Sequence, residues 1–324
     1  MFAAYKLPVL STIPRSGTWF LRYAISFLCH LEAGGRIDDR LTGRLVGSPF
    51  GPRFDFGRFR GGPLFRVKGT LPADHLFIGH TVCPGFEPDA AKWWAQTPFH
   101  VPGYDYLHEG MNYRYTPVEL APYDYAPIDE RALEKATRKG AGGRIVLVYR
   151  NPLDQISSYL HYSREHVSLA YNAFRGRPLR SLSLRDYMFS GALASYAKQF
   201  VSFQQQARRY PDLVRLVRYE RLMAAPVETL AGILDHLAGA PHDRALLADA
   251  VHLARSDHMR AIETELGHSL DGTRSGRGSH IQRSKTGLAI DPKLGKQAEA
   301  YLRLLGIDTE LFDWPTPHEF KISA

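Results

Sequence analysis

The sequence lacks the features of three common protein classes. Only two cysteines, Cys29 and Cys83, occur in 324 residues, which excludes a disulfide-stapled scaffold and favours a reducing, cytoplasmic compartment. No run of about 18 apolar residues could span a bilayer, and the amino terminus has no basic-then-apolar signal pattern. The basic residues are dispersed rather than gathered in blocks, which disfavours a nucleic-acid-binding stripe.

What remains is the composition of a globular protein with excess positive charge. Apolar residues make up 44% of the chain and charged residues 23%, which are ordinary proportions. The length permits one large α/β domain or two small ones. A formal net charge of +8 favours an anionic partner, such as nucleic acid, an acidic membrane or a polyanionic small molecule.

Predicted strands and helices alternate along the chain. The alternation predicts a parallel sheet with helices on both faces, so the expected fold class is α/β, with ligands bound beyond the carboxyl ends of the strands. Strands are expected at 7–13, 75–80, 144–150 and 213–219, and helices from residue 18 to the Gly34-Gly35 pair and at 131–140, 151–166 and 183–210. Residues 36–74 and 84–127 do not fit this pattern and are expected to be long loops.

The first candidate binding motif is the turn Pro14-Arg15-Ser16-Gly17-Thr18, between a predicted strand and a predicted helix. Such a turn directs backbone N–H groups and the positive end of a helix at one point. Arg15 adds a full charge, and Ser16 and Thr18 add hydroxyl groups, so the segment could cradle an anion. It lacks the first glycine and the lysine of a Walker A loop. A polar turn joining two core elements explains the segment equally well.

The second candidate motif begins where the strand at 144–150 ends. Asn151 can cap the following helix and Pro152 suits its first position. Ser158 lies two helical turns beyond Asn151 on the same face, so Ser158 and Arg150 could converge on a second phosphate. Alternatively, Arg150 pairs with an acid and Ser158 is a solvated helix residue.

Both motifs resemble those of the PAPS-dependent sulfotransferases, where PAPS is 3′-phosphoadenosine 5′-phosphosulfate. "TIPRSGTW" resembles their 5′-phosphosulfate loop, P-K-S-G-T-T-W, and "YRNPLDQISSYLHY" resembles their 3′-phosphate motif, R-N-x-x-D-x-x-x-S-Y-x-x. Three weaker matches, "FIGHTV", "VRLVRYERLMAAP" and "QRSKTG", occur in the family's order. The resemblance covers the nucleotide-binding frame and implies a P-loop NTPase-like sulfotransferase fold.

The resemblance also implies an activity. A sulfuryl group would move from PAPS to a hydroxyl group, or less readily an amine, of a small molecule or glycan, leaving 3′,5′-ADP (PAP). Arg15 would stabilise the leaving 5′-phosphate and His80 would be the general base, without a metal. The other implied donor contacts are Ser16, Gly17, Thr18, Trp19, Phe20, Arg150, Ser158, Tyr219, Arg283, Ser284 and Lys285.

The sequence departs from the family pattern at three places. Arg15 stands where lysine is usual, which keeps the charge on a broader, planar group. Trp19-Phe20 replaces Thr-Trp, so Phe20 is the expected adenine-stacking ring. Ser284 stands where glycine is common, and the "GRG" at 276–278 is a rival for the late loop.

The identity of the acceptor is left open. We expect a single domain over residues 1–324, in which 36–74 and 84–127 form a lid or an acceptor pocket, although Trp93 and Trp94 could equally be core. Two alternative functions are a P-loop kinase-like phosphotransferase, which would bind ATP with magnesium, and a non-catalytic basic nucleic-acid-binding protein, which would bind with steep salt dependence.

Overall fold

The main sheet has five strands in the order β4-β5-β1-β6-β9. The computed structural model of the chain describes residues 8–37, 45–46, 64–67, 70–72, 75–80, 83, 143–166, 173–174, 177–178, 181–239, 241–266 and 290–314. Strands β1, β5, β6 and β9 run parallel, and the edge strand β4 pairs antiparallel with β5. In sequence order the five strands are β1 (Val9–Thr12), β4 (Leu64–Arg66), β5 (His75–Gly79), β6 (Ile145–Tyr149) and β9 (Val214–Arg218).

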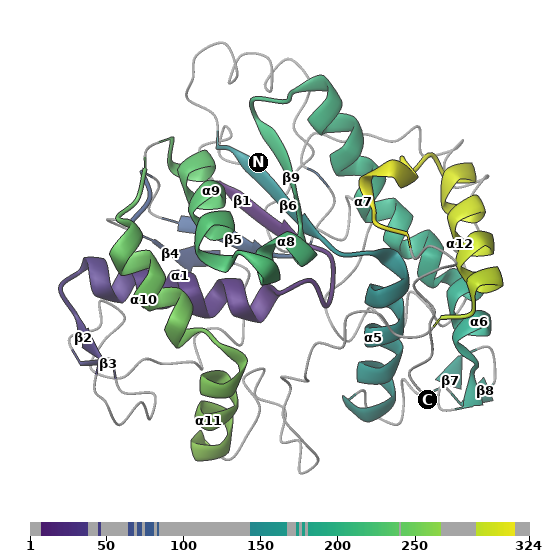
Figure 1. The fold of residues 1–324 in the computed structure, drawn as a ribbon, viewed down its shortest axis with the longest axis horizontal. Coiled ribbons are helices and arrows are strands. Elements are labelled where there is room, and N and C mark those ends of the chain that lie inside the picture. Colours follow the sequence, from purple (N-terminus) through teal and green to yellow (C-terminus); the bar gives the residue numbers. More distant parts are fainter. Residues whose placement is uncertain are drawn as a thin grey trace.

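Helices cover both faces of this sheet (Figure 1). They are α1 (Thr18–Glu32), α5 (Pro152–His166), α6 (Leu184–Tyr187), the π-helix η6 (Met188–Ala192), α7 (Leu193–Arg209), α8 (Tyr219–Ala224), α9 (Pro226–Ala238), α10 (Arg244–Leu253), α11 (Ser256–Leu266), α12 (Pro292–Leu304) and the 3₁₀ turn η7 (Thr309–Leu311). Two small antiparallel pairs join β2 (Arg36–Ile37) to β3 (Leu45–Val46) and β7 (Ala173–Phe174) to β8 (Arg177–Pro178). Within the described part of the chain, no helix combines the length and the apolar character that a membrane span requires.

Two hydrophobic cores lie on opposite faces of the sheet, because successive strand residues point to opposite sides. Val9 of β1 belongs to the core formed with α5, α7 and α12, and Leu10 belongs to the core formed with α1, α9 and α10. Strand β6 is buried along its whole length. A strand buried on both faces is typical of a parallel sheet between helical layers.

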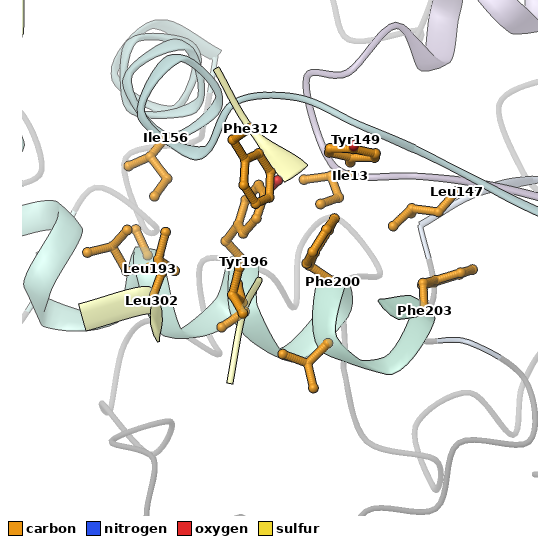
Figure 2. Close-up of a cluster of buried hydrophobic side chains, with 14 of the residues drawn as sticks. Ile13, Leu147, Tyr149, Ile156, Leu193, Tyr196, Phe200, Phe203, Leu302 and Phe312 are labelled. Carbon is orange, nitrogen blue, oxygen red and sulfur yellow. The ribbon is translucent and has the colours of Figure 1, made fainter. Parts of the chain in front are cut away.

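The first core holds α7 and the last described residues against the sheet (Figure 2). The ring of Phe200 on α7 lies 5.0 Å from the ring of Tyr149 on β6 and 5.0 Å from that of Phe312. The Tyr149 hydroxyl donates to the carbonyl of Leu311 at 3.1 Å. Helix α7 is therefore fixed against β1 and β6, where its polar residues can reach the strand ends.

The structure confirms the α/β fold class and the predicted strands and helices that fall on described residues. Two details differ. The helix expected at 183–210 contains one π turn at η6, where Gly191 weakens the α-helical preference. Strand β4 lies in a segment that was expected to be irregular. The sequence did not indicate this strand, because three residues are too few to show a periodic pattern. The loop predicted at 84–127 and the helix predicted at 131–140 lie outside the described residues.

Candidate active site

The turn after β1 has an uncommon backbone conformation at two positions. Arg15 has φ 68° and Gly17 has φ 86°, both in the left-handed region. That region costs a non-glycine residue about 1–2 kcal/mol, so Arg15 stores strain that the surrounding contacts must offset. The N–H of Ser16 donates to the carbonyl of Ile13 at 3.0 Å, which closes the turn. Strain of this kind is concentrated at binding sites.

This turn leads directly into the amino end of α1. Gly17 precedes the helix and has no side chain with which to cap its first N–H groups, which carry the positive end of the helix dipole. Thr18 is the first helical residue, and its Oγ1 lies 2.7 Å from Oγ1 of Thr12. The Ser16 side chain is fully buried, and its Oγ has no hydrogen-bond partner among the described residues. A buried hydroxyl beside uncapped N–H groups and an arginine suits an anion.

Helix α5 holds the turn from its other side. Gln155 Nε2 donates to the carbonyl of Pro14 at 2.9 Å, and Arg15 Nε donates to Ser158 Oγ at 3.3 Å. Gln155 and Ser158 are three residues apart and so share one helix face. The helix starts as predicted, since Asn151 Oδ1 accepts a hydrogen bond from the backbone N–H of Leu153 at 2.9 Å. The two sequence motifs are thus joined through α5.

Arg150 reaches the same turn from the end of β6. Only 4% of this residue is exposed, and its Nη1 donates to the carbonyl of Arg15 at 3.5 Å. The carbonyl of Arg150 accepts from the Tyr196 hydroxyl of α7 at 2.7 Å, which fixes the strand end. The structure therefore brings Arg15, Ser158 and Arg150 together, at the meeting of the two motifs.

Tyr219 packs against both cationic segments. Its ring centre lies 5.0 Å from the guanidinium carbon of Arg150, a cation–π distance. A Cβ on Gly17 would lie 3.2 Å from two ring carbons of Tyr219, so the turn approaches the ring too closely for a larger residue. Tyr219 is 7% exposed, so its ring packs between the Arg150 guanidinium and the Gly17 turn. The contact with the adenine of the donor, which the family resemblance implies for Tyr219, stays a prediction.

His80 lies at the end of β5, beside β1. Its Nδ1 is 2.6 Å from the carbonyl oxygen of Thr12 and 3.2 Å from Thr12 Oγ1. Burial lowers the pKa of His80 to about 3, the bond to Thr12 opposes that shift, and the positive charge of Arg22 reinforces it. The ring is therefore neutral at physiological pH, as a general base must be before it takes a proton.

Comparison with known proteins gives a family match over less than half of the chain. The family model described as sulfotransferase domain matches residues 139–287. The match contains Arg150, Ser158 and Tyr219, whereas the Arg15 turn and His80 precede it. The curated proteins contain no match to the sequence.

Solved structures resemble the chain at low sequence identity. Retinol dehydratase in a complex with retinol and PAP is 15% identical, with a TM-score of 0.50 over 96% of this chain and 84% of that one. Mouse sulfotransferase SULT7A1 complexed with PAP is also 15% identical, with a TM-score of 0.49 over 96% of this chain and 89% of that one. At this identity the likeness to retinol dehydratase concerns the fold alone, and it agrees with the α/β architecture described above.

The structure describes the remaining residues of the predicted donor site only in part. Trp19 and Phe20 are half-buried on the first turn of α1, where the Trp19 ring lies 5.2 Å from the guanidinium carbon of Arg22. Arg283, Ser284 and Lys285, and the rival loop 276–278, lie outside the described residues. Within the described ranges, no group of three or more His, Cys, Asp or Glu residues could hold a metal ion.

Sequence reasoning missed three residues that build this site: Thr12, Gln155 and Gln199. Gln199 of α7 donates from Nε2 to the carbonyl of Thr12 at 3.0 Å, although it lies far along the chain. Thr12 and Gln155 lie within the two quoted segments, but outside the residues that the family pattern specifies, and Gln199 lies in no motif. Gln155 is one helical turn before Ser158, which could have pointed to it.

Proposed function

We propose that the protein is a PAPS-dependent sulfotransferase that transfers a sulfuryl group to a hydroxyl group of a small molecule or glycan and releases PAP. The observation that carries the proposal is the meeting of two cationic segments, with Arg150 Nη1 3.5 Å from the Arg15 carbonyl. The donor has a phosphate at each end of its ribose, which suits two adjoining cationic positions. The sulfotransferase domain match and the PAP named with retinol dehydratase support this assignment.

The 5′ end of the donor would be held by the turn that precedes α1. Ser16, Gly17, Thr18 and the amino end of the helix would bind the 5′-phosphate through N–H and hydroxyl groups. Arg15 would neutralise the charge that develops on the leaving oxygen as the sulfuryl group departs. The buried Ser16 hydroxyl would then gain the hydrogen-bond partner that the protein itself does not give it among the described residues.

The 3′ end of the donor would be held by the second motif. Arg150 and Ser158 would bind the 3′-phosphate, and the predicted late loop at 283–285 would close over it. Because Arg15 Nε donates to Ser158 Oγ at 3.3 Å, the two subsites would share one contact. Occupation of one subsite would therefore alter the hydrogen bonding of the other.

His80 would remove the proton of the acceptor. A bond forms between sulfur and the acceptor oxygen, the bond from sulfur to the 5′-phosphate oxygen breaks, and the hydroxyl proton passes to the imidazole. The pKa of about 3 makes His80 a weak base by itself. Negative charge placed beside the ring on donor binding would raise that pKa toward the range of an effective base.

The acceptor class is proposed only as far as the chemistry allows. Retinol dehydratase is named with retinol, an alcohol, as well as with PAP. We propose a small molecule or glycan with a hydroxyl group, bound by a single-domain chain in which 36–74 and 84–127 form the lid or pocket. The scarcity of cysteine is the argument for a cytoplasmic location.

A transfer assay tests the proposal directly. The purified protein is incubated with ³⁵S-labelled PAPS and a panel of phenols, steroids, glycans and alcohol-bearing metabolites, and labelled products are counted. We expect label on at least one hydroxyl-bearing class and none with His80→Ala. Magnesium-dependent ATP consumption, or salt-sensitive binding of oligonucleotides without transfer, would instead support one of the two alternative functions.

A further inference from the structure

Thr12 is a meeting point for three segments of the site. It is the last residue of β1 and is fully buried. Its carbonyl oxygen lies 2.6 Å from Nδ1 of His80 and 3.0 Å from Nε2 of Gln199. These two contacts come from the end of β5 and from α7, so one carbonyl joins a second strand and a helix to β1.

The first contact fixes where the imidazole proton lies. A carbonyl oxygen has no proton to give, so a bond of 2.6 Å requires that Nδ1 of His80 carries the hydrogen. The neutral ring has only one N–H, and the low pKa of His80 makes the neutral form the relevant one. Nε2 is then the nitrogen that can accept a proton.

The side chain of Thr12 ties the same ring to the turn that precedes α1. Its Oγ1 lies 2.7 Å from Thr18 Oγ1, donates to the carbonyl of Gly79 at 3.3 Å, and lies 3.2 Å from His80 Nδ1. A single buried hydroxyl therefore contacts the proposed base and a residue of the proposed 5′-phosphate loop.

Helix α7 holds this arrangement in place. Gln199 is 1% exposed, and its Nε2 also lies 3.3 Å from Ser11 Oγ. The next turn of the helix supplies Ser202, whose Oγ accepts from the N–H of Cys83 at 2.9 Å. Because Cys83 follows His80 closely, α7 contacts both β1, which holds the ring, and the chain that follows His80. An amide buried in an apolar core is costly unless it is hydrogen-bonded, so its bond to the β1 carbonyl anchors Gln199.

We propose that Thr12 and Gln199 are positioning residues that keep His80 in the Nδ1–H tautomer, with Nε2 as the proton-accepting nitrogen. The proposal rests on the proposed function for its kinetic consequences, whereas the tautomer itself is independent of any reaction. Gln199 fixes the Thr12 carbonyl and the carbonyl holds the ring, while Thr12 Oγ1 keeps the ring in register with Thr18. Loss of either residue lets the ring turn, or lets its proton move from Nδ1 to Nε2. Nε2 then carries a hydrogen and cannot accept the proton of the acceptor.

Long-range ¹H–¹⁵N correlation spectra of uniformly ¹⁵N-labelled protein at neutral pH test the tautomer. His80→Asn identifies the signals of His80 among the 14 histidines by their disappearance. We expect a protonated Nδ1 and an unprotonated Nε2 in the wild-type protein. A predominantly Nε2–H ring, or a fast mixture of both forms, overturns the proposal. This result does not depend on sulfotransfer, so it separates failure of the proposal from failure of the proposed function.

Gln199→Met removes the donated bond at nearly constant volume, and Gln204→Met is its matched control. Gln204 is also buried on α7, and its Nε2 donates to the carbonyl of Gly306 at 2.9 Å, away from His80. We expect Gln199→Met to lower kcat about tenfold, in the range of a lost supporting hydrogen bond, with the Kd for PAP unchanged. It should also raise the Nε2–H fraction of His80. Equal effects of both variants on kcat and on the tautomer would refute the role of Gln199.

Thr12→Val and Thr12→Ser test the hydroxyl separately, and they keep the test open if Gln199→Met does not fold. The valine variant has the same shape without Oγ1, and the serine variant keeps Oγ1. We expect kcat to fall about tenfold for valine and to recover to within about threefold of wild type for serine. If the valine variant keeps the wild-type kcat and the serine variant loses activity, the methyl group rather than the hydroxyl is what matters, and the proposal for Thr12 is wrong.

Discussion

Removal of Arg150 should separate the two ends of the proposed donor. The guanidinium lies within a site formed by the Arg15 turn and the Tyr219 ring, and the residue is 4% exposed. Because Arg150 is shielded from water, a charge-assisted hydrogen bond from its guanidinium to a phosphate is strong. In the proposed arrangement Arg150 binds the 3′-phosphate and has no contact with the 5′-phosphate.

The expected loss can be stated for each ligand. Truncation of one partner of a buried, hydrogen-bonded charge pair costs about 2–4 kcal/mol, so Arg150→Ala should weaken PAP binding roughly 30- to 900-fold. The ligand 5′-AMP lacks the 3′-phosphate and should lose less than about threefold, which is the contribution of altered packing around Tyr219 and of the lost contact with the Arg15 carbonyl. The difference between the two ligands measures the coupling of Arg150 to the 3′-phosphate.

Isothermal titration calorimetry with PAP and 5′-AMP makes this comparison. Arg150→Lys keeps a positive charge and serves as the intermediate case, and Arg215→Ala removes an exposed cation from the neighbouring strand β9 as the control. Thermal unfolding of each variant shows whether the fold survives. Equal losses for PAP and 5′-AMP in a folded Arg150→Ala protein would refute the assignment of Arg150 to the 3′-phosphate.

Three further predictions follow from the site. Gly17→Ala should weaken PAP binding at least about tenfold and lower the free energy of unfolding by about 1–2 kcal/mol. The reasons are that φ of residue 17 is 86° and that the new Cβ would lie 3.2 Å from the Tyr219 ring. Wild-type values in calorimetric titration and in urea unfolding would contradict this prediction. His80→Asn should abolish turnover in the ³⁵S assay, because the amide can donate to the Thr12 carbonyl but cannot act as a base. The Kd for PAP should stay within about threefold of the wild-type value. If turnover survives, His80 is not the general base. The same variant should be less sensitive to acid. Since burial lowers the pKa of His80 from 6.5 to about 3, only the unfolded chain binds its proton between these values, and stability falls as pH falls. Urea unfolding should show that wild type loses up to about 3 kcal/mol more than His80→Asn between about pH 7 and pH 4.5, and identical losses would contradict the low pKa.

The parts of the fold that local patterns determine could be predicted from the sequence. The apolar run of β6 is buried on both faces, and the Asn151-Pro152 start of α5 is capped as expected. The approach of Arg15 to Arg150 follows from strand ends meeting at one edge of a parallel sheet.

The supporting contacts could not be predicted, because they depend on residues far apart in the chain. The bond from Gln199 to Thr12 joins residues that only the packing of α7 against β1 brings together. The left-handed conformation of Arg15 is equally invisible in the sequence, since an arginine ordinarily avoids that region. Strand β4 was missed because its partner β5, rather than its own sequence, determines its conformation.

The affinity of the wild-type protein for PAP relative to 5′-AMP tests the central claim most directly. If Arg15 and Arg150 mark two adjoining anion sites, PAP should bind at least about 30-fold more tightly than 5′-AMP in the same buffer, since the 3′-phosphate adds about 2 kcal/mol or more. Equal dissociation constants for the two nucleotides would contradict the two-site account.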